Sequence, residues 1–361
     1  MKKYNIILIL LLAIAPSIVL AGNNTPKGKY TKEKRVTKEY TVNSNATLEI
    51  DNSYGEVNMV TWNENRVVIE VHVKTNSNDE DQAQDKLDDI DVRFEGNSNY
   101  VSARTNFNNS SRSWWNSWRS SNVNMEVNYT IKLPVTNAID ISNDYGGISL
   151  NKLEGTAKIS CDYGKLTIGD LLGENNYLNF DYTKNSSINY VKSGSINANY
   201  SSFKLDNGDT IDLNADYTKS ELGKIKDLNY TCDYGSIITE EIEKLRGRGD
   251  YLTAKIGRVN KDLNIVADYG SIKIDEISPN ANNIRIQSDY TGIKLGYHND
   301  YHFKFDIKLQ YAGLSGKEDL TILKEHKRSS DRSYEGYHGD ASSSNTLSIN
   351  SEYGGVTLYK N

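Results

Sequence analysis

Proline and cysteine are scarce in this chain of 361 residues, which has four prolines, two cysteines and three methionines. Proline lacks the backbone N–H that a sheet needs, and only Pro279 lies between Tyr145 and Tyr353. That long region is therefore free to form uninterrupted strand pairing. Two cysteines are also too few for a small scaffold held together by disulfides.

Long apolar runs are absent except at the N-terminus. Lys2 and Lys3 precede an apolar run over residues 6–20, and Ala21 suits cleavage after it. This run is short for a membrane span. We interpret residues 1–21 as a secretory signal peptide and expect export across the inner membrane, to the periplasm, the outer surface or the medium. No cysteine follows to support a lipid anchor, and we expect no transmembrane segment.

Strong positive charge and catalytic motifs are missing too. The formal net charge is −6, which argues against nucleic acid as a partner. The five histidines lack zinc-site spacing, and neither a phosphate-binding loop nor a nucleophile–base signature appears. The sequence thus predicts a non-enzymatic protein without a cofactor.

A recurrent tyrosine is the main positive feature. Ten copies are separated by steps of 17 to 21 residues, with Tyr54 as an early copy and Tyr353 as a late one. The ten are Tyr145, Tyr163, Tyr182, Tyr200, Tyr217, Tyr234, Tyr251, Tyr269, Tyr290 and Tyr311. A fixed period is typical of repeat architectures.

Each repeat reads as strand, corner, strand. Apolar residues alternate before the tyrosine, as in Ile265 and Leu263, and resume in shifted phase after it, as in Ile272 and Ile274. A unit this short has no room for a helix and must stack on its neighbours to bury its inner face. We predict an all-β fold, a single-stranded parallel β-solenoid (β-helix) of 17–21-residue coils over residues 136–361. An antiparallel barrel or sandwich is the alternative. The tyrosine shares the parity of the aliphatic positions, so its ring is expected to face inward.

The two cysteines occupy the same slot in different repeats, two residues before Tyr163 and Tyr234. Four coils at ~4.8 Å would place Cys161 and Cys232 about 19 Å apart, whereas a disulfide needs less than about 7 Å. Both are predicted to be buried free thiols.

Residues 22–135 depart from the repeat. We expect an N-terminal strand region with a first coil around Tyr54, followed by a small α+β insert that caps the solenoid. Ala83, Leu87 and Ile90 predict a short amphipathic helix starting near Asp79. Residues 324–346 read as a flexible loop that interrupts the last coils.

The whole arrangement resembles the bacterial putative adhesin family, whose members are envelope β-solenoids common in Bacteroidetes-like bacteria and similar to autotransporter adhesin heads. The resemblance is carried by the first coil from Val57 to Trp62, the segment Tyr129–Pro134, and the Asp-Tyr-Gly coils. It covers most of the mature chain and implies a secreted solenoid without catalytic residues.

An acidic residue precedes most of the tyrosines. In register, these carboxylates would form an outward column ~4.8 Å apart. Hydrogen bonding of each Asp to the backbone just beyond the corner is one interpretation. Calcium bridging adjacent coils is another, with candidate ligands Asp216, Asp233, Asp250 and Asp268.

A tryptophan-rich loop lies between Asn106 and Asn122. Aromatic and Arg side chains in a Ser/Asn-rich loop are typical of contact sites for proteins, glycans or membrane headgroups. The alternative is that the tryptophans fold back to cover the sheet of the insert or the end of the solenoid. The candidate binding residues are Arg112, Trp114, Trp115, Trp118 and Arg119.

We therefore expect an adhesin-like binding protein of the bacterial cell envelope, with a protein or glycan at the cell surface as partner. A β-helix enzyme acting on acidic polysaccharide and a purely structural envelope protein are the alternatives.

Overall fold

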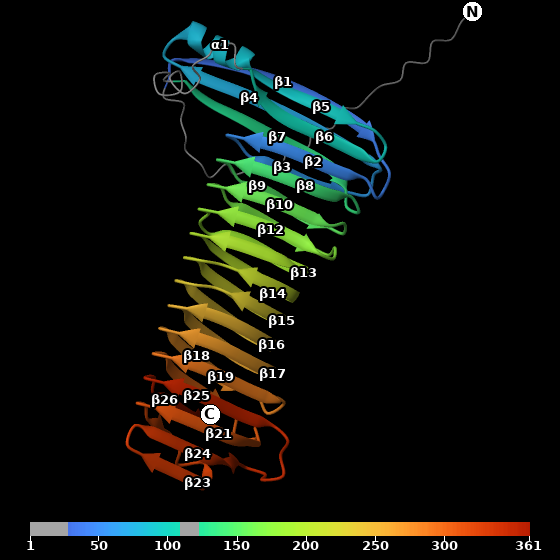
Figure 1. The fold of residues 1–361 in the computed structure, drawn as a ribbon. Coiled ribbons are helices and arrows are strands. Elements are labelled where there is room, and N and C mark those ends of the chain that lie inside the picture. Colours follow the sequence, from blue (N-terminus) through green and yellow to red (C-terminus); the bar gives the residue numbers. More distant parts are fainter. Residues whose placement is uncertain (1–27, 109–122) are drawn as a thin grey trace, which may run out of the picture.

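The computed structural model describes residues 28–108 and 123–361. Figure 1 shows an elongated molecule built almost entirely from strands, and α1 (Glu80–Asp89) is the only helix among the described residues. The prediction of an all-β protein is therefore confirmed. Most strand pairings are parallel. Within the described ranges, no helix has the length and apolar character needed to cross a membrane.

Successive repeats in the centre pair side by side and in parallel (Figure 1). Ile141, Ile159 and Leu178 are partners across β8, β10 and β12, although each comes from a different repeat. The strands of this stack are β8 Ala138–Asp144, β9 Ile148–Leu153, β10 Ala157–Asp162, β11 Leu166–Leu171, β12 Asn176–Asp181, β13 Ser186–Asn199, β14 Ser202–Asn214, β15 Lys219–Thr231, β16 Ser236–Asp250, β17 Thr253–Asp268, β18 Ser271–Ile277, β19 Asn283–Asp289 and β20 Gly292–Tyr297.

The alternating aliphatic residues form one continuous buried core. In β17, Ile256, Val259, Leu263 and Ile265 are at most 2% exposed. Burying such a side chain stabilises the fold by about 1.5–3 kcal/mol, so each repeat depends on the repeats above and below it.

The predicted inward orientation of the tyrosines is wrong. Each of the twelve recurrent tyrosines has a positive φ, between 47° and 65°. The parity argument assumes continuously extended backbone, but the left-handed conformation ends the strand and turns the ring outward. The rings from Tyr145 onward are 47 to 61% exposed.

The residue after the tyrosine enters the core instead. Thr218 is 3% exposed, and its hydroxyl donates to the carbonyl oxygens of Asp216 at 3.0 Å and Ala198 at 2.9 Å. Thr291 makes the equivalent bonds to Asp289 and Ala267. These bonds satisfy carbonyl groups at a buried corner, where an unpaired polar atom would be destabilising.

The N-terminal region covers one end of the stack (Figure 1). β2 pairs with β6 and β8, β3 pairs with β7 and β9, and β4 joins β1 to β7 in antiparallel fashion. Asp79 caps α1 by accepting a hydrogen bond from the Gln82 N–H, and Ala83 and Leu87 are buried as their spacing predicts. The strands are β1 Tyr30–Thr41, β2 Thr47–Ser53, β3 Val57–Trp62, β4 Arg66–Ser77, β5 Ile90–Gly96, β6 Tyr100–Phe107 and β7 Asn124–Pro134.

The C-terminal end does not follow sequence order. β25 lies between β19 and β21, and β26 lies between β20 and β22, all in parallel. The last repeat of the chain is therefore inserted between the repeats of Tyr290 and Tyr311. The strands are β21 Phe303–Gln310, β22 Leu314–Ser315, β23 Thr321–Arg328, β24 Asp331–His338, β25 Thr346–Glu352 and β26 Val356–Lys360.

The loop predicted at 324–346 is largely a hairpin. β23 and β24 pair in antiparallel fashion, and β24 pairs with β21 to cover the far edge of the stack. In β24, Tyr334 and His338 are buried, although the rest of the segment is polar. The prediction missed this strand because the polar composition is typical of a loop. The division of the chain into 1–21, 22–135 and 136–361 stays a prediction.

Cys161 and Cys232 are both free and buried, as predicted. Burial raises the pKa of each thiol to about 12. Both thiols are therefore protonated and unreactive in the folded protein.

Candidate functional site

The outward tyrosines form a ladder of stacked rings along the molecule, here named the tyrosine ladder. Ring centroids of successive members lie 4.7 to 5.2 Å apart, with planes within 9° of parallel. This spacing equals that of paired strands, about 4.8 Å, because each ring is fixed to one repeat. The order is Tyr54, Tyr145, Tyr163, Tyr182, Tyr200, Tyr217, Tyr234, Tyr251, Tyr269, Tyr290, Tyr353 and Tyr311.

The ladder is not needed to make the corner. A left-handed non-glycine residue costs about 1–2 kcal/mol, and Gly or Asn adopts this conformation more readily. Ring stacking contributes about 0.5–1.5 kcal/mol per pair, which offsets that cost without a large surplus. The tyrosines are thus retained at corners where glycine or asparagine would cost less backbone strain.

The ring edges face the solvent rather than the ring faces, because each face is covered by the next ring. One terminal ring, Tyr54, meets Phe107 edge-on at 6.0 Å and 82°. At the other end, Tyr311 is the most exposed member, at 61%. The ladder thus presents a row of phenol hydroxyl groups rather than a series of flat platforms.

Some of these phenols have a raised pKa. Partial burial, followed by the neighbouring tyrosines, raises the pKa of Tyr163 and Tyr234 above the ordinary value. The same causes raise the pKa of Tyr353 near the far end. A protonated phenol both donates and accepts hydrogen bonds.

The residues before the tyrosines line a second column beside the ladder. Asp216 Oδ1 accepts a hydrogen bond from the Asp233 N–H at 3.0 Å, and Asp233 Oδ1 accepts one from the Asp250 N–H at 2.8 Å. The partner is thus the equivalent residue of the next repeat, not the backbone just beyond the corner. Asp268 repeats the arrangement with Asp289 at 3.1 Å.

Two members near the N-terminal end of this column are perturbed. Desolvation and then the negative charge of Asp162 raise the pKa of Asp144, and desolvation raises the pKa of Asp162.

Calcium binding by Asp216, Asp233, Asp250 and Asp268 stays a prediction from the sequence. One oxygen of Asp216, Asp233 and Asp268 is already bonded to the backbone. In residues 28–108 and 123–361, no group of three or more His, Cys, Asp or Glu side chains is placed to hold a metal ion.

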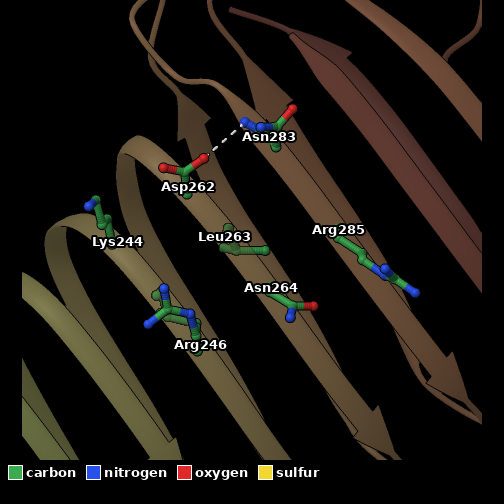
Figure 2. A pocket seen from close by; sticks show the side chains of 8 residues that line it. Lys244, Arg246, Asp262, Leu263, Asn264, Asn283 and Arg285 are labelled. Atoms are coloured by element: carbon green, nitrogen blue, oxygen red, sulfur yellow. Dashed lines mark hydrogen bonds between the residues drawn. The ribbon is translucent and has the colours of Figure 1, made fainter.

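The outer face of β16, β17 and β19 carries unpaired basic side chains. An open depression of about 280 Å³ lies there, and Leu245 and Leu263 are part of its lining. Figure 2 shows its side chains from close by. Its polar lining consists of Lys244, Arg246, Asp262, Asn264, Asn283 and Arg285.

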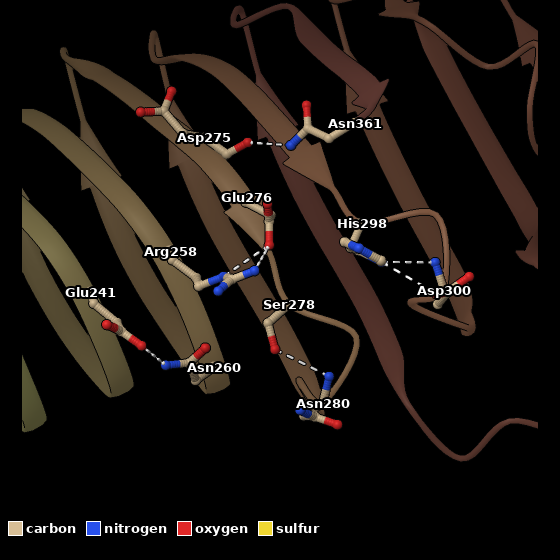
Figure 3. A network of polar contacts seen from close by, with 10 residues as sticks. All are labelled: Glu241, Arg258, Asn260, Asp275, Glu276, Ser278, Asn280, His298, Asp300 and Asn361. Carbon is tan, nitrogen blue, oxygen red and sulfur yellow. Dashed lines mark hydrogen bonds and ion pairs between the residues drawn. The ribbon is translucent and has the colours of Figure 1, made fainter.

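A different corner, after the second strand of each repeat, holds polar pairs that link neighbouring repeats (Figure 3). Arg258 donates to Glu276 of the next repeat, and Asn260 donates to Glu241 at 2.7 Å. These side chains satisfy one another, so this corner is a structural crosslink rather than an open site.

The predicted binding residues Arg112, Trp114, Trp115, Trp118 and Arg119 lie outside the described residues. Sequence reasoning identified the recurrent tyrosines but assigned them to the core. The signal that would have placed them outside is the Asp-Tyr-Gly/Thr sequence, because residues of this type mark a turn that interrupts strand parity.

Comparisons with known proteins establish no family. No family model matches the chain, and no curated protein matches it. A structure of a putative cell adhesion protein from Clostridium sporogenes is 11% identical, with 92% of this chain and 100% of that chain covered and a TM-score of 0.20. A putative adhesin from Parabacteroides merdae is 10% identical, with 73% and 92% covered and a TM-score of 0.33.

A putative lipid binding protein from Parabacteroides distasonis is also similar, at 9% identity, with 90% of this chain and 96% of that chain covered and a TM-score of 0.30. These scores are too low to transfer a fold or a function to this chain.

Proposed function

We propose that this protein is a non-enzymatic, adhesin-like binding protein of the bacterial cell envelope. The single observation that carries the proposal is the tyrosine ladder, a long and half-exposed aromatic column in a left-handed backbone conformation. Tyrosine is enriched at protein contact surfaces because it combines an apolar ring with a hydroxyl group. The predicted signal peptide supports an extracytoplasmic location.

The proposed architecture is a β-solenoid with one coil per repeat. The in-register parallel pairing of equivalent residues supports it, as in the partners Ile211 and Leu228 followed by Leu228 and Leu245. Such an object displays each repeat position as a straight column on its surface. A partner would therefore meet many identical contacts, and weak individual contacts would add up.

The two alternatives make different demands. A β-helix enzyme acting on acidic polysaccharide would need one repeat whose polar side chains differ from the rest. The uniform backbone bonding of Asp216, Asp233 and Asp268 favours a repeated structural role over a catalytic one. A purely structural protein would not need exposed tyrosines at its corners.

The test replaces three adjacent ladder residues, Tyr200, Tyr217 and Tyr234, by Asn, which tolerates the left-handed conformation. Binding of the exported chain is measured on plates coated with outer-membrane vesicles, peptidoglycan or mucin. We expect wild type to bind at least one coating, and the triple variant to bind it at least tenfold more weakly.

The matched control removes side-chain atoms from the same repeats on the same face, with Asn197, Asn214 and Thr231 each changed to Ser. It should bind within twofold of wild type. A second variant, with the three tyrosines changed to Phe, keeps the stacked rings and shows whether the hydroxyl groups are required. Equal binding by wild type and the Asn variant would refute the proposal, as would wild type that binds no coating.

The tryptophan loop is proposed as a second contact region, on composition alone. Iodide quenching of tryptophan fluorescence should exceed that of a buried indole if Trp114, Trp115 and Trp118 are accessible. Changing all three to Ala should then weaken binding without lowering the melting temperature.

A further inference from the structure

We propose that the face of β16, β17 and β19 binds a linear anionic polysaccharide through Arg246 and Arg285. The inference rests on the proposed role as a binding protein and names the chemistry of one of its ligands. It is carried by a column of outward residues on this face, here named the arginine column.

The arginine column alternates basic and amide side chains. Asn229 pairs with Arg246, Arg246 with Asn264, and Asn264 with Arg285, each on the next strand of the stack. Arg248 lies on the same face two residues beyond Arg246. All three arginines are exposed, and none of them has a carboxylate within ion-pair distance among the described residues.

The lack of partners is a departure from the rest of the same face. Nearer the N-terminal end, Lys158 of the same column pairs with Asp140 at 2.9 Å. Beside it, Arg104 pairs with Asp51 at 3.0 Å. At the C-terminal end, Lys308 pairs with Asp306 at 3.0 Å. Several basic side chains on this face are thus paired with carboxylates, whereas Arg246, Arg248 and Arg285 have no ion pair among the described residues.

The charges nearby do not cancel these arginines. Asp262 in the depression accepts hydrogen bonds from the Asn282 side chain and the Asn283 N–H, both at 3.3 Å, so it is directed to the loop (Figure 2). Lys244, two residues before Arg246 in β16, adds a further basic group to the lining. Asp250 of the acidic column lies two residues along β16 from Arg248 and four residues, or about 13 Å, from Arg246.

The spacing suits a polymer rather than a single small anion. Arg246 and Arg285 are two strands apart, so their side chains start about 10 Å apart along the stack. An extended polysaccharide with one acidic group in each disaccharide carries its charges at a similar interval. Guanidinium groups bind carboxylates and sulfates through paired hydrogen bonds, and Asn264 between them offers a donor and an acceptor for sugar hydroxyls.

The depression is open and shallow, which fits a chain that lies along the surface. A linear polymer would run parallel to the stack, across the strands, and cross β16, β17 and β19 in turn. Neutral glycans would lack the carboxylate that Arg246 and Arg285 recognise.

The experiment measures binding of the exported chain to hyaluronan, which has one carboxylate per disaccharide, and to neutral dextran, at low and at physiological salt. We expect binding to hyaluronan only, weakened by salt because the contacts are ionic. The variant Arg246→Gln with Arg285→Gln should bind at least tenfold more weakly.

The matched control is Lys255→Gln with Lys294→Gln. Lys255 and Lys294 belong to the same two repeats as Arg246 and Arg285 but lie on another face of the stack. The control variant therefore removes the same number of positive charges. This control should bind within twofold of wild type. An equal loss in both double variants would overturn the proposal in favour of attraction by overall charge, and absence of hyaluronan binding by wild type would overturn it directly.

The ladder variant with Tyr200, Tyr217 and Tyr234 changed to Asn separates this inference from the proposed function. It should keep full hyaluronan binding. If hyaluronan binding fails while ladder-dependent binding to envelope components persists, only the arginine-column proposal is refuted.

Discussion

Each left-handed tyrosine turns its own ring outward and stacks it on the rings of the neighbouring repeats. At Tyr217 the φ angle is 53°, and the ring stacks on Tyr200 at 4.8 Å and on Tyr234 at 4.9 Å. A buried aromatic residue would lose about 3–5 kcal/mol on change to Ala. Because this ring is half exposed, Tyr217→Ala should lose only about 1–3 kcal/mol, the contribution of two stacked pairs.

Tyr217→Gly should be more stable than Tyr217→Ala by about 1 kcal/mol, because glycine adopts a positive φ without strain. Urea unfolding of both variants measures the difference. Asp216→Ala is an informative neighbour, since it removes the acceptor of the Asp233 N–H and should cost about 1 kcal/mol. Greater stability of the Ala variant than the Gly variant would contradict the left-handed corner.

The cysteines give a second test at this scale. Cys161 and Cys232 are buried and their pKa is raised to about 12, so neither should react with a thiol reagent at pH 8 in the folded protein. Titration with Ellman's reagent should detect no thiol in the native protein and both after denaturation. Detection of a Cys161–Cys232 disulfide by mass spectrometry would be incompatible with the observed pairing of repeats.

The sequence predicted the state of the cysteines but not the direction of the tyrosine rings. The buried thiols followed from their shared slot, because strand spacing alone separates them. The direction of the tyrosine rings did not follow, because alternation tells the face of a residue only while the backbone stays extended. A single positive φ reverses the assignment, and no pattern of apolar residues reports the sign of φ.

At the scale of elements, the insertion of β25 and β26 ties the chain end to two earlier repeats. Ile349 of β25 pairs with Ile286 on one side and Ile307 on the other, and it is 1% exposed. Removing residues 346–361 should therefore separate two repeats and leave edges on both sides of the gap. We expect a large fall in melting temperature and the formation of aggregates, measured by thermal unfolding and size-exclusion chromatography.

A conservative variant keeps this prediction testable if the truncated chain fails to fold. Ile349→Ala should cost about 2–5 kcal/mol, whereas Thr357→Ala, on the outward side of β26, should cost under 1 kcal/mol. A truncated chain that melts within a few degrees of wild type would show that the last repeat is a terminal addition.

The sequence predicted the strands and their parallel pairing because apolar alternation recurs at one period. It did not predict the order of the last repeats, since equivalent repeats have nearly interchangeable inner faces. Leu347 lies between Ile284 and Phe305, and either Leu347 or Phe305 would fit beside Ile284. Which repeat occupies that place depends on the loops that connect the strands. The β23–β24 hairpin was missed because its polar residues resemble a loop.

For the whole molecule, the repeat converts each position into a column, so three kinds of surface run side by side. The tyrosine ladder, the acidic column and the arginine column are each defined by one position of the repeat. A change of one residue type in a few repeats, as at Arg246 and Arg285, therefore creates a local patch without changing the fold.

Three tyrosines of the ladder should make the protein sensitive to alkali. Burial and neighbouring tyrosines raise the pKa of Tyr163, Tyr234 and Tyr353, so the folded state holds these phenol protons more tightly than the unfolded chain. Their contribution is complete below the unfolded pKa of about 10 and is lost as pH rises through the folded values. Stability should thus be constant to about pH 9 and fall above pH 10.

Core tyrosines such as Tyr129 and Tyr230 also have a raised pKa and contribute in the same direction, so wild type alone does not isolate the ladder. The variant with Tyr163, Tyr234 and Tyr353 changed to Phe keeps the stacked rings but has no phenol proton to lose at these positions. Its melting temperature should fall less than that of wild type between pH 9 and pH 11. Absorbance at 295 nm should show three fewer titrating groups. Identical alkaline losses in the two proteins would mean that the ladder rings ionise as freely in the folded protein as in the unfolded chain, and that they do not act as a neutral hydroxyl row.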